Sequence, residues 1–366
     1  MKFDFKHQDA RLSKLREVMS NNDVDAVLLT SRENNRYFAN FSGTTSICLI
    51  TEHFAKIYVD SRYIEQAKEQ CGAFEAVLVT SPQAKMFDDL KEAKVKRLAI
   101  EDEDVTVSYL NGLKKLDDKS CVEFVSLSSL ISKIRFVKDA FEIEQLKIAA
   151  KLADNAFLDL LKVIKVGMKE CEVAAYIENH MRMNGASAPS FDTIVASGYR
   201  SAMPHGVASE KLIEKGDAVT IDFGCIYNGY CSDTTRTIFV GGVREEKLVD
   251  VYNTVLLAQT TAVSKIRAGM TGQEADAIAR DIISGKGYGE YFGHSLGHST
   301  GLLIHELPSL SPSYKDSIPL GSMVTVEPGI YIAGLGGVRI EDSCLVTEAG
   351  LEAFNHTPKE LLVVEN

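Results

Sequence analysis

Several features are missing from this chain of 366 residues, and each absence argues against a class of protein. No block of Lys or Arg gathers along it and the formal net charge is −11, so we expect no surface that follows a phosphate backbone. No run of eighteen apolar residues occurs, which argues against a membrane-spanning helix. Neither the dinucleotide fingerprint G-x-G-x-x-G after the first predicted strand nor a P-loop motif is present. The sequence therefore predicts no nucleic-acid partner, no membrane partner and no nucleotide site.

Paired cysteine motifs are also absent. The seven cysteines are scattered without C-x-x-C spacing, and their odd number is typical of reduced thiols in a large chain; they are residues 48, 71, 121, 171, 225, 231 and 344. The first twenty residues carry charges throughout and lack the apolar stretch of a signal peptide. These features predict a cytoplasmic protein.

The length and the hydrophobic pattern predict two domains. A chain of this size exceeds the limit at which a single core usually stops growing. Residues 1–131 alternate helical signals with short β-rich runs, which predicts an α/β domain; the runs are 25–30, 46–51, 55–60, 75–80 and 97–102. Longer helices then alternate with hairpins, so residues 132–366 are predicted to form an α+β domain.

Three long helices are predicted in the second domain. Asp139 and Glu142 have the spacing of a capping box, and an apolar stripe from Phe141 to Leu160 follows them. The next helix is expected over residues 170–183, and the third over residues 246–267, each ending near a glycine.

The segment from Gly293 to Glu306 reads GHSLGHSTGLLIHE and raises two hypotheses. Its two G-x-S-x-G matches could mark a serine nucleophile, and its three histidines could serve a metal. A nucleophile elbow needs a buried strand before the serine and a helix after it. Glycines and charges precede this segment, and Pro308 and Pro312 follow it, so neither flank suits an elbow. The metal hypothesis is therefore favoured.

Two carboxylates are predicted to face one another across a hairpin. Residues 218–240 contain two β-rich runs joined at Asn228-Gly229, a strong hairpin signal. If these residues form the turn, Asp222 lies opposite Thr235 and shares its face with Asp233. The surrounding positions are apolar, and two buried charges about 4 Å apart repel by about 4 kcal/mol. A cation between them is expected, unless a bulge changes the register.

A second pair of carboxylates follows. Glu327 ends a β-rich run, and Glu341 is expected in a later strand on the same face as Arg339. Four carboxylates and one neutral imidazole carry a charge of −4, which two divalent ions would neutralise. Oxygen-rich ligation favours manganese, cobalt, iron or magnesium over structural zinc, and two such ions would produce a bridging hydroxide able to hydrolyse a bond.

These residues resemble the pita-bread metallopeptidases, in their proline-specific branch of aminopeptidase P and prolidase. The resemblance covers nearly the whole chain, including an α/β creatinase-type N-terminal domain, and rests on IDFG (221–224), CSDTTRT (231–237), GHSLGH (293–298), TVEPGIY (325–331) and GVRIED (337–342), with SFDTIVASG (190–198) and PHG (204–206) in support. It implies five metal ligands, which are Asp222, Asp233, His298, Glu327 and Glu341.

The resemblance also implies roles at the substrate. His205, His294 and His305 match positions that contact the substrate or the tetrahedral intermediate. Glu327 matches the acid that moves a proton between nucleophile and leaving amine, and Arg339 matches a residue that orients the ligands. Ser299 and Thr300 depart from the usual family pattern, although neither is a ligand position.

The expected function is that of an Xaa-Pro aminopeptidase, which removes an N-terminal residue preceding proline with two divalent metal ions. Manganese is favoured, and cobalt, iron and zinc are alternatives. The main alternative function is that of a prolidase limited to Xaa-Pro dipeptides; others are a non-catalytic binding protein on the same fold and a creatinase-like hydrolase without metal. The expected partner is a proline-containing peptide, and the chain is expected to form a homodimer or higher homo-oligomer.

Overall fold

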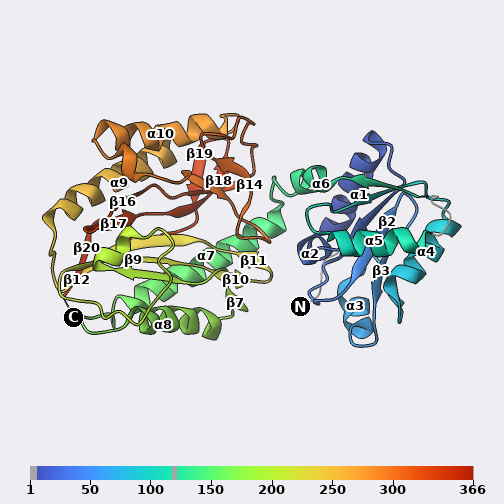
Figure 1. Ribbon diagram of the computed structural model, residues 1–366, viewed down its shortest axis with the longest axis horizontal. Helices are drawn as coiled ribbons and strands as arrows, with labels where there is room; N and C mark the ends of the chain where they lie inside the picture. The colour runs from blue at the N-terminus through green and yellow to red at the C-terminus, as the bar shows by residue number, and fades with distance from the viewer. Residues whose placement is uncertain (1–5, 118–121, 366) are drawn as a thin grey trace. The chain divides into compact units, whose positions relative to one another are not determined.

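The structure is a computed structural model that describes residues 6–117 and 122–365, and it divides into two compact units (Figure 1). The first unit is Met1–Arg135 and the second is Phe136–Asn366. The boundary predicted after residue 131 falls inside α6 (Ser128–Ile134), a helix that belongs to the first unit. The change of sequence pattern thus comes shortly before the division seen in space.

A six-stranded mixed sheet forms the centre of the first unit. Its strand order is β4-β3-β2-β1-β5-β6, and β1 pairs antiparallel with β2 and parallel with β5. The strands are β1 (Ala26–Leu29), β2 (Ile47–Thr51), β3 (Ala55–Val59), β4 (Glu75–Leu78), β5 (Arg97–Ile100) and β6 (Glu123–Ser126). The five β-rich runs of the sequence are the first five strands, so the predicted α/β character is confirmed; β6 was not predicted.

In the described part of this unit, six helices accompany the sheet. They are α1 (Lys6–Asn21), α2 (Arg32–Ala39), α3 (Ile64–Gln70), α4 (Pro82–Glu92), α5 (Val107–Leu116) and α6. Leu28 and Tyr58 from the strands pack with Phe87 and Leu113 from α4 and α5 in one apolar core. None of the described helices in either unit combines the length and apolarity needed to cross a membrane.

The second unit is a layered α+β structure, as predicted. Figure 1 shows its strands between α7 and α8 on one side and α9 and α10 on the other. The helices are α7 (Ala140–Leu160), α8 (Glu170–Met183), α9 (Glu246–Lys265) and α10 (Gly272–Gly285), with two 3₁₀ turns, η1 (Gly198–Ala202) and η2 (Gly289–Tyr291).

Within residues 136–365, five small sheets make up the strand layer of this unit. Their strand orders are β20-β12-β9-β8, β11-β10-β7, β15-β18-β19, β16-β17 and β13-β14. The strands are β7 (Ala188–Pro189), β8 (Ile194–Ser197), β9 (Asp217–Phe223), β10 (Cys225–Tyr227), β11 (Tyr230–Cys231), β12 (Thr234–Val240), β13 (Gly297–Ser299), β14 (Glu306–Leu310), β15 (Met323–Val326), β16 (Gly329–Ile332), β17 (Gly336–Arg339), β18 (Asp342–Thr347), β19 (Gly350–Ala353) and β20 (Leu362–Val364).

The predicted helices are confirmed. Asp139 and Glu142 form the capping box of α7, and α8 and α9 begin at the expected residues. Phe157 of α7 stacks on Phe223 of β9 with ring centroids 5.9 Å apart, and burying each such side chain stabilises the fold by about 1.5–3 kcal/mol. The helix α10 was not predicted, although Thr271 begins it with a capping box of its own.

Alternation along β9 gives the strand two different faces. Ile221 and Phe223 pack in the core that contains α7 and α8, whereas Ala218 packs in the core that contains α9 and α10. Because successive side chains of a strand point to opposite faces, Asp222 shares the face of Ala218. It therefore points away from the core of α7 and α8, into the interior of the unit.

Six cysteines lie within the described residues, and no two of these six are joined by a disulfide. Cys121, the seventh cysteine considered in the sequence, lies outside the described residues.

Candidate metal centre

The hairpin between β9 and β12 places two carboxylates on one face. At the turn, residues 228 and 229 both have positive φ, 47° and 88°, as a type I′ turn requires. The residues on either side of the turn pair with each other, and Asp222 lies opposite Thr235, so the predicted register is confirmed. Asp233, two residues before Thr235, consequently faces the same side as Asp222.

A glycine keeps this register intact where the ladder is interrupted. Between β9 and β10, the backbone N–H of Ser232 still donates to the carbonyl oxygen of Cys225 at 2.9 Å. A Cβ at Gly224 would lie 1.9 Å from the carbonyl oxygen of Ser232, so only glycine fits. No net bulge changes the parity, and the condition attached to the prediction is met.

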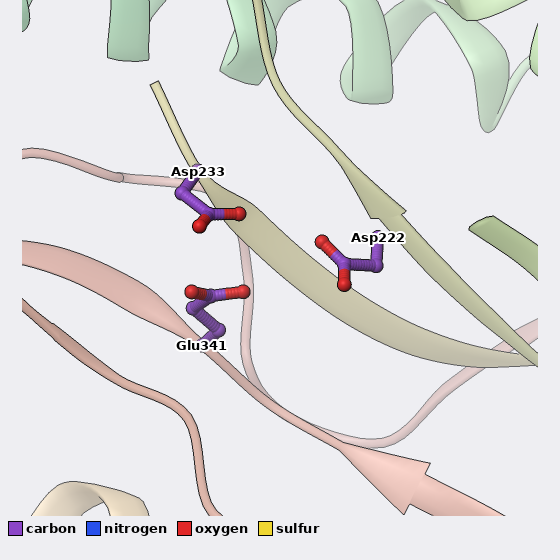
Figure 2. Close-up of side chains that lie close together, drawn as sticks. All are labelled: Asp222, Asp233 and Glu341. Atoms are coloured by element: carbon purple, nitrogen blue, oxygen red, sulfur yellow. The ribbon is translucent and has the colours of Figure 1, made fainter. Parts of the chain in front are cut away.

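Glu341 joins the two aspartates from another part of the chain (Figure 2). One oxygen from each of Asp222, Asp233 and Glu341 lies within 4.8 Å of the other two. Thr235 donates a hydrogen bond of 2.7 Å to Glu341 and accepts one of 3.1 Å from Arg339, which turns both side chains toward the hairpin.

The expectation that Glu341 stands inside a strand is wrong. It occupies the short joint between β17, which ends at Arg339, and β18, which begins at Asp342. Its backbone N–H donates to the carbonyl oxygen of Thr235 at 3.1 Å. The position is therefore fixed by a bond across to β12, because the strand that was expected to hold it is interrupted there.

Two oxygens of this cluster have no hydrogen-bond partner among the described residues. Asp222 Oδ1 and Glu341 Oε1 are both buried without a donor. A buried acceptor without a donor costs about 1–3 kcal/mol, and more when it is charged. Divalent cations between these oxygens would remove that cost. The carboxylate oxygens of the cluster therefore fit, as metal ligands, the ions that the sequence predicted.

His298 and Glu327 lie at the edge of the same cluster. Nε2 of His298 is 3.6 Å from Asp233 Oδ2 and 3.3 Å from Glu327 Oε1. Thr325 connects the two residues, since its hydroxyl accepts the backbone N–H of His298 at 3.0 Å and donates to Glu327 at 3.2 Å. A Cβ at Gly297 would lie 2.0 Å from the carbonyl oxygen of Thr325, so this glycine lets β13 approach β15.

The electrostatics of the cluster call for added positive charge. Burial raises the pKa of Asp233 well above its usual range, and the charges of Asp222 and Glu327 raise it further. Burial and the neighbouring carboxylates also raise the pKa of Glu341. Burial lowers the pKa of His298 to about 4, so its imidazole is neutral near pH 7, the form that binds metals. Protons or cations must neutralise part of the carboxylate charge.

Arg339 links a ligand carboxylate to two further side chains. Its guanidinium donates to Asp222 Oδ2 at 2.6 Å and to the hydroxyl of Tyr331 at 2.6 Å. Tyr331 in turn forms a hydrogen bond of 2.9 Å with Nε2 of His294. Burial lowers the pKa of His294 to about 4, so this imidazole is also neutral at pH 7. Tyr331 therefore lies between Arg339 and His294 and connects them through its hydroxyl.

All the predicted site residues line one cavity of about 450 Å³. The five proposed ligands are present together with His205, His294, His305 and Arg339. The ring of His305 contacts that of His298 edge to face, with centroids 4.5 Å apart. His205 lines the cavity from the chain segment that follows η1. Apolar side chains complete the wall, including Phe191, Ile194 and Val207.

The two threonines that bond to ligand carboxylates escaped the sequence analysis. Thr325 stands two residues before Glu327, and Thr235 stands two residues after Asp233. Residues two positions apart along an extended chain point to the same face. This spacing predicts that each threonine lies beside a proposed ligand.

The serine hypothesis receives no support. The segment holds the short strand β13, and no helix follows it before β14, so the strand-turn-helix of an elbow is missing from this described part of the chain. Ser299 is fully buried and its hydroxyl donates to the carbonyl oxygen of Thr300.

The fold and the carboxylate-rich cavity define a two-domain protein with a site suited to divalent cations. The chain belongs to metallopeptidase family M24: the sequence model of that family matches residues 144–348, and the model of the creatinase/prolidase N-terminal domain matches residues 11–137. It is therefore a peptidase whose second unit has the pita-bread fold.

Individual relatives extend over both units. An Xaa-Pro dipeptidase from Pyrococcus horikoshii is 42% identical over 96% of this chain and 98% of its own length. The solved structure of an Xaa-Pro dipeptidase from Bacillus anthracis is 46% identical with a TM-score of 0.94, covering 97% of this chain and 99% of its own. That of an X-Pro aminopeptidase from Thermotoga maritima is 39% identical with a TM-score of 0.90, covering 97% and 100%.

Proposed function

We propose that this protein is a metal-dependent Xaa-Pro dipeptidase. The observation that carries the proposal is the convergence of four carboxylates and one neutral imidazole on one cavity, with buried oxygens of Asp222 and Glu341 left without donors. The proposed ligands of two divalent ions are Asp222, Asp233, His298, Glu327 and Glu341. Manganese is the favoured ion because the atoms that would bind the metal are mostly hard carboxylate oxygens.

The ions, when bound, supply Lewis acidity that activates water and polarises the scissile carbonyl. The remaining tasks belong to the protein. Glu327 lines the cavity and accepts a hydrogen bond from Thr325, so its carboxylate can accept a proton from the attacking water and deliver it to the leaving amine. Arg339 fixes the Asp222 carboxylate through a charged hydrogen bond. His205, His294 and His305 stand where they can donate to or accept from the substrate.

Proline selectivity is supported by the chemistry of the cavity wall. Proline presents an apolar ring and no N–H, and Phe191, Ile194 and Val207 offer an apolar surface beside the carboxylates. A dedicated site is reasonable, because proline changes both the shape and the hydrogen bonding of the scissile bond.

The choice of dipeptidase over aminopeptidase rests on the relatives. The sequence alone favoured an aminopeptidase and kept the dipeptidase as the alternative, whereas the Pyrococcus and Bacillus anthracis relatives are both Xaa-Pro dipeptidases. The aminopeptidase stays as a second candidate because the Thermotoga maritima structure is that of an X-Pro aminopeptidase.

Three peptides distinguish these activities. The purified protein is stripped of metal, supplied with manganese or cobalt, and incubated with Ala-Pro, Ala-Pro-Ala and Ala-Ala-Ala. Cleavage of Ala-Pro alone supports the dipeptidase, and removal of the first alanine from Ala-Pro-Ala establishes the aminopeptidase. Efficient cleavage of Ala-Ala-Ala would refute proline selectivity, and no metal-dependent cleavage would refute the proposed function.

Two further expectations accompany the proposal. A non-catalytic binding protein should retain no stoichiometric metal, so metal analysis of the purified protein separates that alternative from an enzyme. We also expect a cytoplasmic homodimer or higher homo-oligomer, and light scattering that detects only monomer would contradict the oligomer.

A further inference from the structure

Residues 197–209 form the segment that carries His205, and this segment has little regular structure of its own. Between the end of β8 at Ser197 and the start of β9, the regular features are the 3₁₀ turn η1 and two isolated β-bridges, Val207 to Ile194 and Leu212 to Lys169. Pro204, His205 and Val207 nevertheless line the cavity, and the His205 side chain is exposed. Contacts elsewhere in the segment must therefore fix the histidine.

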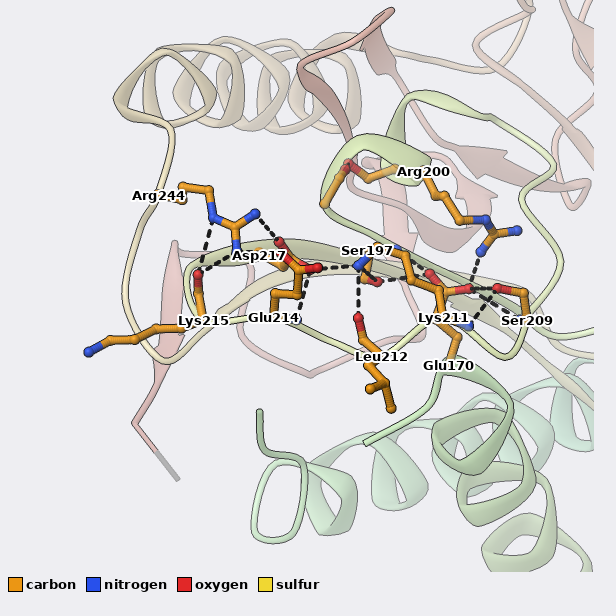
Figure 3. Close-up of polar contacts among 12 residues, drawn as sticks. Glu170, Ser197, Arg200, Ser209, Lys211, Leu212, Glu214, Lys215, Asp217 and Arg244 are labelled. Atoms are coloured by element: carbon orange, nitrogen blue, oxygen red, sulfur yellow. Dashed lines mark hydrogen bonds and ion pairs between the residues drawn. The ribbon is translucent and has the colours of Figure 1, made fainter. Parts of the chain in front are cut away.

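A single buried carboxylate joins the two ends of this segment (Figure 3). Glu170, the first residue of α8, is completely buried. At the start of the segment it accepts from the backbone N–H and the hydroxyl of Ser197, both at 2.8 Å. At the far end it accepts from the backbone N–H and the hydroxyl of Ser209, at 3.1 and 2.6 Å.

Arg200 extends this contact to the stretch that flanks His205. Its guanidinium forms an ion pair with Glu170 and also donates to the carbonyl oxygen of Val207 at 3.0 Å. Two residues before Val207 lies His205. The Glu170 carboxylate thus contacts Ser197 at the start of the segment, Ser209 at its end and Arg200 between them.

The start of the segment is held from a second direction. Lys211 donates to the hydroxyl of Ser197 at 2.9 Å and to the Asp217 carboxylate at 2.8 Å. Gly198 has a left-handed backbone with φ of 57°, and a Cβ there would lie 2.8 Å from that same carboxylate. The segment therefore leaves β8 in one direction only.

The buried Glu170 carboxylate depends on the hydrogen bonds that it accepts from Ser197, Arg200 and Ser209. An unpaired buried charge is costly, and every donor just described to Glu170 comes from residues 197–209. Moving the segment would leave the carboxylate without partners, so the burial of Glu170 opposes such movement. Glu170 itself is not among the residues that line the cavity.

We propose that Glu170 is a positioning residue that acts on catalysis through His205, by holding the segment 197–209 in the conformation that presents this histidine to the substrate. The proposal rests on the proposed function, because it needs a peptide substrate in the cavity. It adds a residue outside the metal centre and outside the cavity wall.

The test compares Glu170→Gln with Glu210→Gln in the manganese-loaded protein. The glutamine side chain keeps the size of the original but loses the charge that pairs with Arg200. Glu210 is the matched control, since its side chain is 82% exposed and forms an ion pair with Lys169 at the surface. We expect Glu170→Gln to lower kcat/KM on Ala-Pro by roughly ten- to a hundred-fold, the scale of a misplaced catalytic group, with bound metal unchanged. Glu210→Gln should stay within about two-fold of wild type.

A double mutant separates positioning from general loss of stability. If Glu170 acts through His205, the change Glu170→Gln should alter kcat/KM by less than about two-fold in a His205→Ala background. An equal loss in both backgrounds would overturn the proposal. Arg200→Lys keeps the charge but loses the planar fork that reaches both Glu170 and Val207, so it should lower kcat/KM in the same direction even if Glu170→Gln fails to fold.

Hydrogen exchange of the segment provides a readout that needs no activity. Backbone amides in residues 198–209 should exchange faster in Glu170→Gln than in wild type or Glu210→Gln. Unchanged exchange would overturn the proposal even if activity fell. If the wild-type protein cleaves none of the peptides, the proposed function fails, and the exchange measurement still decides whether Glu170 holds the segment.

Discussion

Replacing Asp233 by Asn should abolish metal binding and yet make the metal-free protein more stable. Asp233 is 5% exposed and lies against two other carboxylates. In the metal-free protein this arrangement has a repulsive cost that the ions would remove. Asparagine keeps the size of the side chain and eliminates one of the charges.

The size of the effect follows from the spacing. Oxygens of Asp222, Asp233 and Glu341 lie within 4.8 Å of one another, and two unit charges at that distance repel by about 3.5 kcal/mol at an effective dielectric constant of 20. The positive charge of Arg339 and partial protonation reduce this figure, so we expect a gain of about 2 kcal/mol. For a unit of this size, that corresponds to a rise in Tm of roughly 4–8 °C.

Calorimetry with and without manganese measures both parts of this prediction. In EDTA the Asp233→Asn variant should melt above the wild type, whereas added manganese should raise only the wild-type Tm. Asp281→Asn, an exposed change on α10, serves as the control and should leave both values unchanged. A variant that melts below wild type in EDTA, or that manganese stabilises equally, would refute the reasoning.

Three further predictions concern the ligands, the hairpin and the first unit. His298→Ala should lose manganese on dialysis, whereas His305→Ala, whose ring lies 4.5 Å away, should keep the metal and lose turnover; equal metal contents would contradict these roles. Gly224→Ala should destabilise the second unit by about 3 kcal/mol or more, because its Cβ would lie 1.9 Å from a backbone oxygen, whereas Gly285→Ala meets no atom within 4 Å; equal Tm values would refute the close approach. Burial by itself raises the pKa of Asp89, but hydrogen bonds from three side chains outweigh this effect and lower the pKa below 3.8. The ionised carboxylate therefore stabilises the first unit at neutral pH, and this contribution is lost as the pH falls through the lowered pKa. Urea midpoints of wild type and Asp89→Asn should therefore converge between about pH 5 and pH 2, and parallel curves would show that Asp89 makes no such contribution.

Much of the fold could be predicted because local signals agree with it. The capping box at Asp139, the Asn228-Gly229 turn and the period-two apolar runs each specify a short element, and each is found where it was expected. The carboxylates of the hairpin could be paired for the same reason, since a turn of two residues fixes which positions lie opposite one another. The helix α10 was not predicted, although the capping box of Thr271 and Glu274 is an equally local signal for it.

The expected interior strand position of Glu341 was wrong because local pattern does not show where a strand is interrupted. The residues from Gly336 to Thr347 alternate as one strand would, but the chain leaves one sheet and joins another in the middle of them. The bond from Thr235 that holds Glu341 joins residues 106 positions apart. No periodicity encodes a contact of that range.

The sequence by itself determined the residue types, the hairpin register and the charge that two divalent ions would balance, because these depend on neighbours along the chain. Tertiary structure alone decided which oxygens lack a donor, how Arg339 reaches both Asp222 and Tyr331, and how Glu170 holds both ends of the segment that carries His205. Those features depend on distances between elements that fold together from separate parts of the chain, and such distances are set by the packing of the whole unit.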